Sequence, residues 1–199
     1  VDDKENARYL LESNLPIEGR SAEETARVVG AWQQGFNAVW KGGSYQDYVK
    51  ANAIFGADPF VQFMGWGSTV TEDAFNAYRA QFEDGALSVD EEHELAIYIP
   101  DFGPLLASLD VPVLALFGAL DTNVDWRQTR ALYEATIGEN PEADLTVRVF
   151  DGANHNLKQA ETGGVREMFA QPGDTPYAEG YFDTMAGWIV ANGFGSRPD

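Results

Sequence analysis

The sequence predicts an α/β protein in which a mainly helical first half precedes two strands that alternate with helices. Apolar residues recur with helical spacing through the first half of the chain. Residues 111–117, VPVLALF, instead form an uninterrupted apolar run, and residues 145–150, LTVRVF, alternate in polarity. The order strand, helix, strand, helix indicates a right-handed parallel crossover.

The first half predicts four helical segments. Residues 3–13 predict a short helix that ends in the turn NLPIEGR. Ser21 followed by Glu24 is typical of a capping box, and it opens a helix whose apolar residues lie four apart, at Val28, Trp32, Phe36 and Trp40. Residues 45–55 and 72–82 predict two further helices, joined by the aromatic loop ADPFVQFMGWGSTV.

The second half predicts the strand pair and its helices. VPVLALF is typical of a parallel strand covered on both faces, and Asp125 can cap a helix that runs to about Ile137. LTVRVF suits a strand nearer a sheet edge, and the loop ETGGVREMFAQPGDTP leads to a last helix over residues 177–191. Two strands cannot cover VPVLALF on both faces and both edges, so we expect neighbouring strands outside this chain; HELAIYIP, the best further candidate, is short and ends in proline.

The composition excludes several classes of partner and site. The net charge is −19, from 32 acidic and 13 basic residues, so phosphate backbones and anionic membrane surfaces are poor partners. With no cysteine, the chain can form neither disulfides nor thiolate metal sites. No apolar run approaches the ~20 residues of a membrane span, and the charged start VDDKENARYL is not a signal peptide. The cellular compartment stays open.

Asp121 and His155 each follow one of the predicted strands. Ligands gather beyond the carboxyl ends of parallel strands, so the two side chains are expected to lie together although they are far apart in sequence. An aspartate that accepts a ring N–H fixes the tautomer of a histidine and makes its other nitrogen a base. Each residue alone is more often a turn, cap or surface residue, but the joint arrangement favours a catalytic pair.

The two stretches VPVLALFGALDTNVD and LTVRVFDGANHNL resemble the last two strands of the α/β-hydrolase superfamily, in its esterase and serine-peptidase-like branch. The resemblance implies that Gly118-Ala119-Leu120-Asp121 carries the triad acid and Gly152-Ala153-Asn154-His155 carries the triad histidine. The stretch NARYLLESNLPIEGRSAEETARVV is similar to the helical insertions of that branch. It implies a helical cap over residues 1–95 and the C-terminal part of the hydrolase core over residues 96–199.

The family's nucleophile lies on a Gly-x-Ser-x-Gly turn, and the sequence contains no such motif. Ser44 and Ser68 come nearest, but neither follows a strand, and both are better interpreted as cap or turn residues. We therefore expect the nucleophile and the oxyanion donors on an N-terminal half of the same polypeptide that is absent from this chain, which would make the chain a cleavage product or a fragment.

Two further groups of residues have alternative interpretations. His93, flanked by acidic residues, is interpreted as a solvated surface residue rather than a metal ligand, so no metal site is expected. Several aromatic residues of the first half could line an acyl pocket or pack the core, and core packing is favoured: Trp32, Trp40, Phe60, Phe63 and Trp66.

The expected function is serine-dependent hydrolysis of a small ester or related acyl compound, with Asp121 and His155 as acid and base and without a cofactor. Other hydrolase-fold chemistries remain open, because peptidases, dehalogenases and C–C hydrolases reuse the same Asp and His. A non-catalytic binding protein on the same scaffold is the alternative from a different class.

Overall fold

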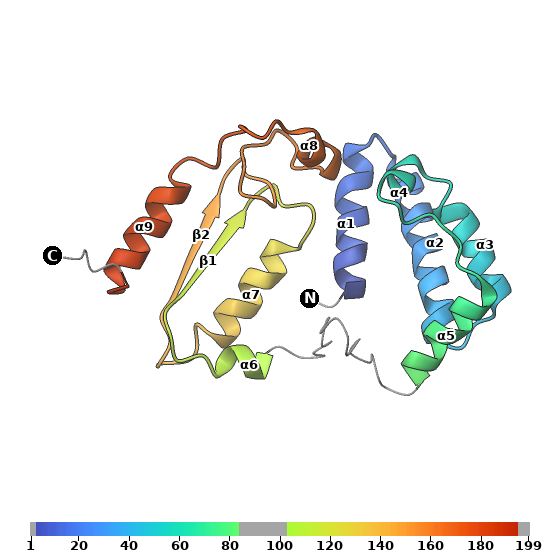
Figure 1. Ribbon diagram of the computed structural model, residues 1–199, viewed down its shortest axis with the longest axis horizontal. Coiled ribbons are helices and arrows are strands. Elements are labelled where there is room, and N and C mark those ends of the chain that lie inside the picture. The colour runs from blue at the N-terminus through green and yellow to red at the C-terminus, as the bar shows by residue number, and fades with distance from the viewer. Residues whose placement is uncertain (1–2, 84–102, 195–199) are drawn as a thin grey trace. The chain divides into compact units, whose positions relative to one another are not determined.

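The computed structural model describes residues 3–83 and 103–194, which form a mixed α/β arrangement with one parallel strand pair. The chain divides into two compact units (Figure 1). Val1–Ile17 and Pro100–Asp199 form the first, called here the sheet unit, and Glu18–Ile99 form the second, the helical unit. The predicted α/β class is confirmed at this level.

Eleven elements lie within the described ranges. The sheet unit contains α1 (Asp3–Ile17), α6 (Gly103–Ala107), β1 (Val113–Gly118), α7 (Trp126–Thr136), β2 (Leu145–Phe150), α8 (Val165–Ala170) and α9 (Tyr181–Ala191). The helical unit contains α2 (Ala22–Trp40), α3 (Tyr45–Phe55), α4 (Pro59–Phe63) and α5 (Glu72–Glu83). HELAIYIP lies outside the described residues.

The two predicted strands pair in parallel and are connected through α7, which confirms a parallel crossover connection. The register runs from Val113 opposite Leu145 to Gly118 opposite Phe150. Asp125 caps the connecting helix α7, because its Oδ1 accepts the backbone N–H groups of residues 127 and 128. Within the described ranges β2 is the only partner of β1, and most β1 side chains remain partly exposed. The full coverage that the apolar run predicts is therefore not reached inside this part of the chain.

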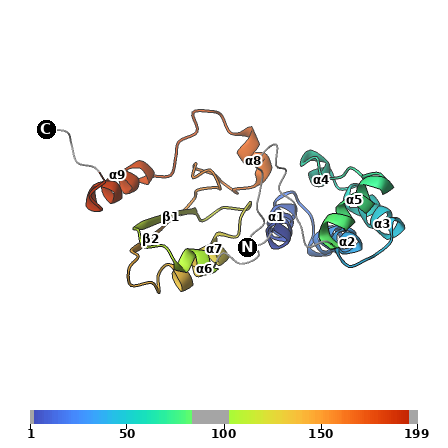
Figure 2. The ribbon, with the colours of Figure 1, turned by 60° about the horizontal axis from the view of Figure 1, so that its bottom comes forward.

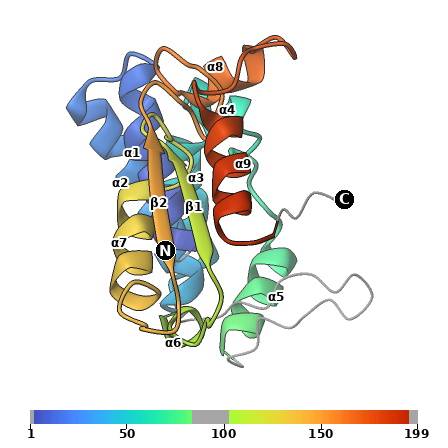
Figure 3. The same ribbon diagram turned by 90° about the vertical axis from the view of Figure 1, so that its left-hand side faces the viewer.

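Helices lie on both faces of the strand pair, with α7 on one side and α9 on the other (Figure 3). On the α7 face, the Phe117 ring packs against Trp126 at a centroid distance of 6.2 Å. On the α9 face, the Phe150 ring meets Tyr181 edge-on at 6.0 Å. Phe117 lies opposite Val149 in the register, one position before Phe150, so the two rings point to opposite faces, as the period of two in a strand requires.

Helix α1 is longer than the sequence predicts. It continues through the expected turn to Ile17, with Pro16 in its last turn. Leu11 and Leu15 are fully buried, so apolar packing holds this end of the helix although Pro16 lacks a backbone donor. The structure groups the helix with the sheet unit, whereas the resemblance to the hydrolases implies a cap over residues 1–95.

The helical unit is built on α2, α3 and α5, which lie side by side in two views (Figures 1 and 2). The capping box predicted at Ser21 and Glu24 is confirmed, and Ser44 forms a second one with Asp47. The predicted loop between α3 and α5 contains the short helix α4, with Asp58 as its N-cap. Asp58 also pairs with Arg20 at 2.7 Å, an ion pair that joins α4 to the start of the unit.

The last part of the chain differs from the prediction in two places. The predicted loop 161–176 contains helix α8, and the final helix begins at Tyr181 rather than at residue 177. Residues before α9 extend along the turn after β2 instead, where Lys158 and Tyr177 form an isolated antiparallel bridge. Long-range backbone pairing therefore replaces the expected first turn of the helix.

Candidate functional site

The turns that follow β1 and β2 lie against each other at the carboxyl end of the sheet. The backbone N–H of Leu120 donates to the carbonyl of Ala153 at 2.9 Å, which continues the strand pairing into the turns. Gly118 allows this approach, because a Cβ atom there would lie 2.4 Å from the carbonyl oxygen of Ala153. The sequence motif Gly-x-x-Asp thus begins with a glycine for a steric reason.

The Asp121 carboxylate is buried, and both of its oxygens have partners. Oδ1 accepts the backbone N–H groups of Asn123 at 2.9 Å and of Val124 at 3.0 Å. Oδ2 lies 2.9 Å from Nδ1 of His155. The local turn therefore fixes one oxygen and directs the other at the histidine.

The second ring nitrogen of His155 is not used by Asp121. Because an ionised carboxylate can only accept, Nδ1 carries the proton of the shared hydrogen bond and Nε2 is left as a free acceptor. Nε2 has no hydrogen-bond partner among the described residues, and 41% of the His155 side chain is exposed. The structure thus brings Asp121 and His155 together in the arrangement of an oriented base.

The charge state of His155 depends on Asp121. The hydrogen bond to Asp121 raises the pKa of His155 above its usual value near 6.5, partial burial opposes this, and the negative charge of Asp121 adds to the rise. The imidazolium form is therefore stabilised, as a histidine that must take up a proton during a reaction requires.

The turn that carries His155 is fixed by a buried neighbour. The Oδ1 atom of Asn154 accepts the backbone N–H groups of Asn156 at 3.0 Å and of Lys158 at 3.2 Å, while its Nδ2 donates to Gln171. Leu157, at the end of this turn, has a φ of 57° in the left-handed region. A bulky residue holds that conformation only where its surroundings impose it, so the position of the histidine is determined locally.

The turn that carries Asp121 is held by α1, a helix that lies far from this turn in the sequence. The Tyr9 hydroxyl donates to the backbone carbonyl of Asp121 at 2.7 Å. Asn14 donates to the carbonyl of Thr122 at 3.1 Å. Burial raises the pKa of Tyr9, so this hydroxyl stays protonated and remains a donor. No local pattern in the sequence signals these two contacts, because they join residues that are 112 and 108 positions apart.

Glu167 of α8 fixes the loop next to the Asp121 turn. Its carboxylate accepts the backbone N–H groups of Glu161, Thr162 and Gly163. Burial alone would raise the pKa of Glu167, but hydrogen bonds from the Thr162 hydroxyl and from these N–H groups lower it. The carbonyl of Gly163 then accepts the Thr122 hydroxyl at 2.8 Å, so the loop braces the turn.

The other residues singled out from the sequence lie elsewhere. Ser44 is the N-cap of α3, as predicted, and Ser68 is exposed on a loop of the helical unit. Phe60 is fully buried in the core of that unit, while Trp32 and Trp66 line a hollow of about 230 Å³. His93 and the side chain of Trp40 are outside what the structure describes.

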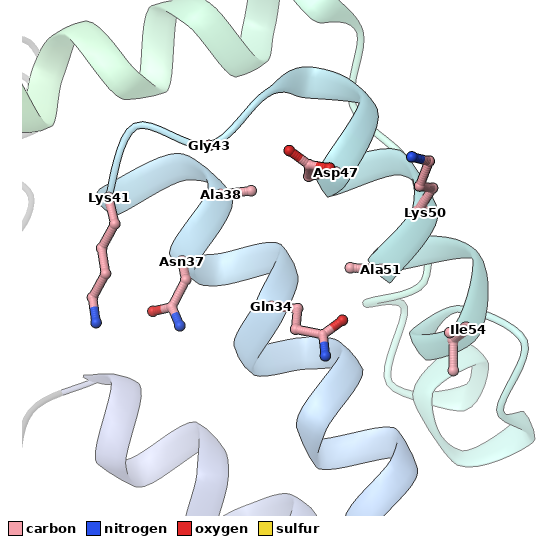
Figure 4. Close-up of a pocket in the computed structure, with 9 residues that line it drawn as sticks. All are labelled: Gln34, Asn37, Ala38, Lys41, Gly43, Asp47, Lys50, Ala51 and Ile54. Atoms are coloured by element: carbon pink, nitrogen blue, oxygen red, sulfur yellow. The ribbon is translucent and has the colours of Figure 1, made fainter.

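A second hollow of the helical unit lies between α2 and α3 and has a volume of about 440 Å³ (Figure 4). Ala38 and Ala51 project into the gap between the two helices, and Lys41 and Lys50 stand at its rim (Figure 4). None of the polar residues that line the hollow is buried, so it has no buried polar group that could define a ligand.

Two general observations concern the described residues as a whole. They contain no group of three or more His, Asp or Glu side chains that could hold a metal ion. None of their helices combines the length and the apolar character that crossing a membrane requires.

Comparisons of the chain with models of protein families, with curated proteins and with solved structures found no match.

Proposed function

We propose that this chain supplies the acid and the base of a serine hydrolase that cleaves carboxylic esters. The observation that carries the proposal is the 2.9 Å contact between His155 Nδ1 and Asp121 Oδ2, with Nε2 left open on a side chain that is 41% exposed. Nucleophile and oxyanion donors come from a segment that is not among the 199 residues, because no Gly-x-Ser-x-Gly motif is present in them.

In the proposed reaction, the serine hydroxyl oxygen attacks the ester carbonyl, and His155 Nε2 accepts the proton of that hydroxyl. The same nitrogen returns the proton to the departing alkoxide, and a water molecule then repeats both steps on the acyl-enzyme. Asp121 holds the ring in place and stabilises the imidazolium, which agrees with the raised pKa of His155.

Placement in the chain supports the same proposal. Both residues follow parallel strands at the end where ligands bind in open α/β sheets. The order acid, then histidine, each after a strand and a Gly-x-x turn, is that of the α/β-hydrolases. An Asp–His pair alone occurs for other reasons, so the proposal also depends on the resemblance of both turns to that family.

The test is hydrolysis of p-nitrophenyl butyrate by the protein together with its nucleophile-bearing segment. His155→Ala removes the base, and kcat/KM is expected to fall by a factor on the order of 10⁴ or more, with circular dichroism unchanged. His93→Ala is the matched control, because His93 is the other histidine of the sequence, and near-normal turnover is expected.

Labelling with a fluorophosphonate probe separates the enzyme from a binding protein on the same scaffold. The probe is expected to label the nucleophile-bearing segment and to leave this chain unlabelled. If the folded, complete protein reacts with no probe, or if His155→Ala hydrolyses the ester normally, the proposed function is wrong.

A further inference from the structure

Asn14 is a buried polar residue of the sheet unit that contacts both the Asp121 turn and the start of α8. It lies in α1 and is 1% exposed. Its Nδ2 donates to the carbonyls of Leu10 at 2.9 Å and of Thr122 at 3.1 Å. Its Oδ1 accepts the backbone N–H of Val165 at 2.8 Å and lies 3.4 Å from the Thr122 hydroxyl.

These contacts use three of the four hydrogen-bonding positions of the amide. Both N–H groups of Asn14 donate and its Oδ1 accepts the N–H of Val165, while the Thr122 hydroxyl, whose proton goes to the carbonyl of Gly163, lies 3.4 Å from the same Oδ1. A buried amide is costly unless it is satisfied, so this arrangement is consistent with one fixed orientation of the side chain. No aliphatic residue of similar size could make the same contacts.

Asn14 also completes the start of α8. The N-cap residue of that helix, Gly164, has no side chain to accept the first free N–H groups. Asn14 accepts the N–H of Val165 instead, across 151 residues of sequence. The same amide that holds Thr122 therefore fixes α8, whose Glu167 braces the loop beside Thr122.

We infer that Asn14 is a positioning residue for the catalytic pair, which holds the Asp121 turn at the distance and angle that His155 requires. Thr122 is adjacent to Asp121, so a displacement of its carbonyl moves the carboxylate. Tyr9 holds only the carbonyl of Asp121 itself, whereas Asn14 connects the turn to two other segments. This inference deepens the proposed function and rests on it, because the Asp121–His155 pair is catalytic only in a hydrolase.

The test is the replacement Asn14→Leu, read out at His155 by NMR. The His155 ring signals are assigned by their loss in His155→Ala, and their titration is followed in the wild type, in Asn14→Leu and in Asp121→Asn. If Asn14 positions the acid, the pKa of His155 in folded Asn14→Leu falls at least halfway to its value in Asp121→Asn. In the complete protein, kcat for p-nitrophenyl butyrate falls on the order of 100-fold with little change in KM.

Asn52 provides the matched control. It is a buried asparagine on a helix of the helical unit, where its Nδ2 donates to Thr69 at 2.7 Å and to the carbonyl of Gly67. Asn52→Leu is expected to lower the melting temperature without moving the pKa of His155. A general loss of stability would affect both variants alike, so the control separates positioning from folding.

Asn14→Ser keeps the test open if Asn14→Leu does not fold. Serine is smaller and polar, but it lacks the amide that joins the carbonyl of Thr122 to the N–H of Val165. A fall in the pKa of His155, in the same direction, is expected. An unchanged pKa in either folded variant overturns the inference, even if the protein hydrolyses esters. A lowered pKa in a protein that hydrolyses none supports the positioning of Asp121 and refutes the proposed function alone.

Discussion

At the scale of single residues, the Asp121–His155 pair couples stability to pH. The folded pKa of His155 lies above its unfolded value near 6.5, because the folded histidine gains the hydrogen bond and the charge of Asp121. The stabilisation is thus fully present below the unfolded pKa and is lost as pH rises through the folded pKa. The His155 side chain is 41% exposed, so solvent screening keeps the effect small.

His155→Gln tests this coupling, because glutamine cannot take up the proton. The stability difference between wild type and variant, from urea unfolding at pH 6 and pH 9, is expected to be larger at pH 6. A difference that grows toward pH 9 would mean that the folded pKa of His155 is lowered.

Asp121→Asn is expected to change the pH dependence of catalysis in the complete protein. It lowers the pKa of His155, so the acid limb of the kcat/KM profile moves to lower pH, and the maximal rate is reduced.

The sequence predicts the contact between Asp121 and His155 better than the contacts that hold their turns in place. Asp121, His155 and the cap at Asp125 stand in local motifs, so their surroundings can be anticipated from a few neighbouring residues. Tyr9 and Asn14 act on a turn more than a hundred residues away, and no local pattern encodes such a contact. The sequence also predicts that the first helix ends before Asn14, because the turn NLPIEGR with its proline begins there.

At the scale of elements, the close approach of the two turns depends on Gly118. A Cβ atom at this position would lie 2.3 Å from the carbonyl oxygen of Asn154, which is backbone and cannot rotate away. Gly118→Ala is therefore expected to cost about 1–3 kcal/mol of unfolding free energy and to separate the two turns. Urea unfolding measures the cost, and the NMR titration of His155 detects the separation as a lowered pKa.

Gly187→Ala in α9 is the control for that change. Its added methyl group meets no atom within 4 Å, and the residue lies inside a helix. Alanine is the better helix former, so this variant is expected to gain about 0.5–1 kcal/mol and to leave the His155 titration unchanged. Equal effects of the two replacements would show that the turns do not depend on Gly118.

The strands and the long helices follow from the sequence, and the short helices do not. Residues 145–150 and 45–55 show strong local patterns, and the elements match them. Helices α4 and α8 span only five and six residues, within stretches rich in glycine, proline and aromatic residues. Such short helices depend on tertiary contacts, as the bond from Asn14 to α8 illustrates.

At the scale of the whole molecule, the chain divides into two compact units. The helical unit contains a nearly buried ion pair, because the Asp58 side chain is 4% exposed beside Arg20. Burial alone would raise the pKa of Asp58, but the hydrogen bonds from Arg20 and from the N–H of Phe60 lower it. Its contribution is therefore present above the unfolded pKa of an aspartate and is lost as pH falls through the folded value.

Arg20→Met tests this pair, because it leaves the Asp58 carboxylate without its cation. We expect a loss of about 1–3 kcal/mol at neutral pH, with the largest decrease of amide protection from hydrogen exchange in the helical unit. The loss should shrink in acid. Arg130→Met is the control: its 2.8 Å pair with Glu134 is exposed on both sides, and less than about 1 kcal/mol is expected. Equal losses would contradict the role of burial.

The division of the chain was only partly predictable. The contrast between helical and strand-containing halves is visible in the sequence. The membership of α1 in the sheet unit is set by contacts that span 108 to 151 residues. A boundary drawn from local composition cannot detect such contacts.

The Asn14 amide has a further consequence for a chain that contains no cysteine. Its hydrogen bonds reach residues 108 and 151 positions away, so they restrict the backbone between distant segments, as a disulfide does in many secreted domains. A disulfide breaks when it is reduced, whereas the hydrogen bonds of Asn14 break and re-form with thermal motion. Their strength therefore does not depend on whether the surroundings are oxidising or reducing.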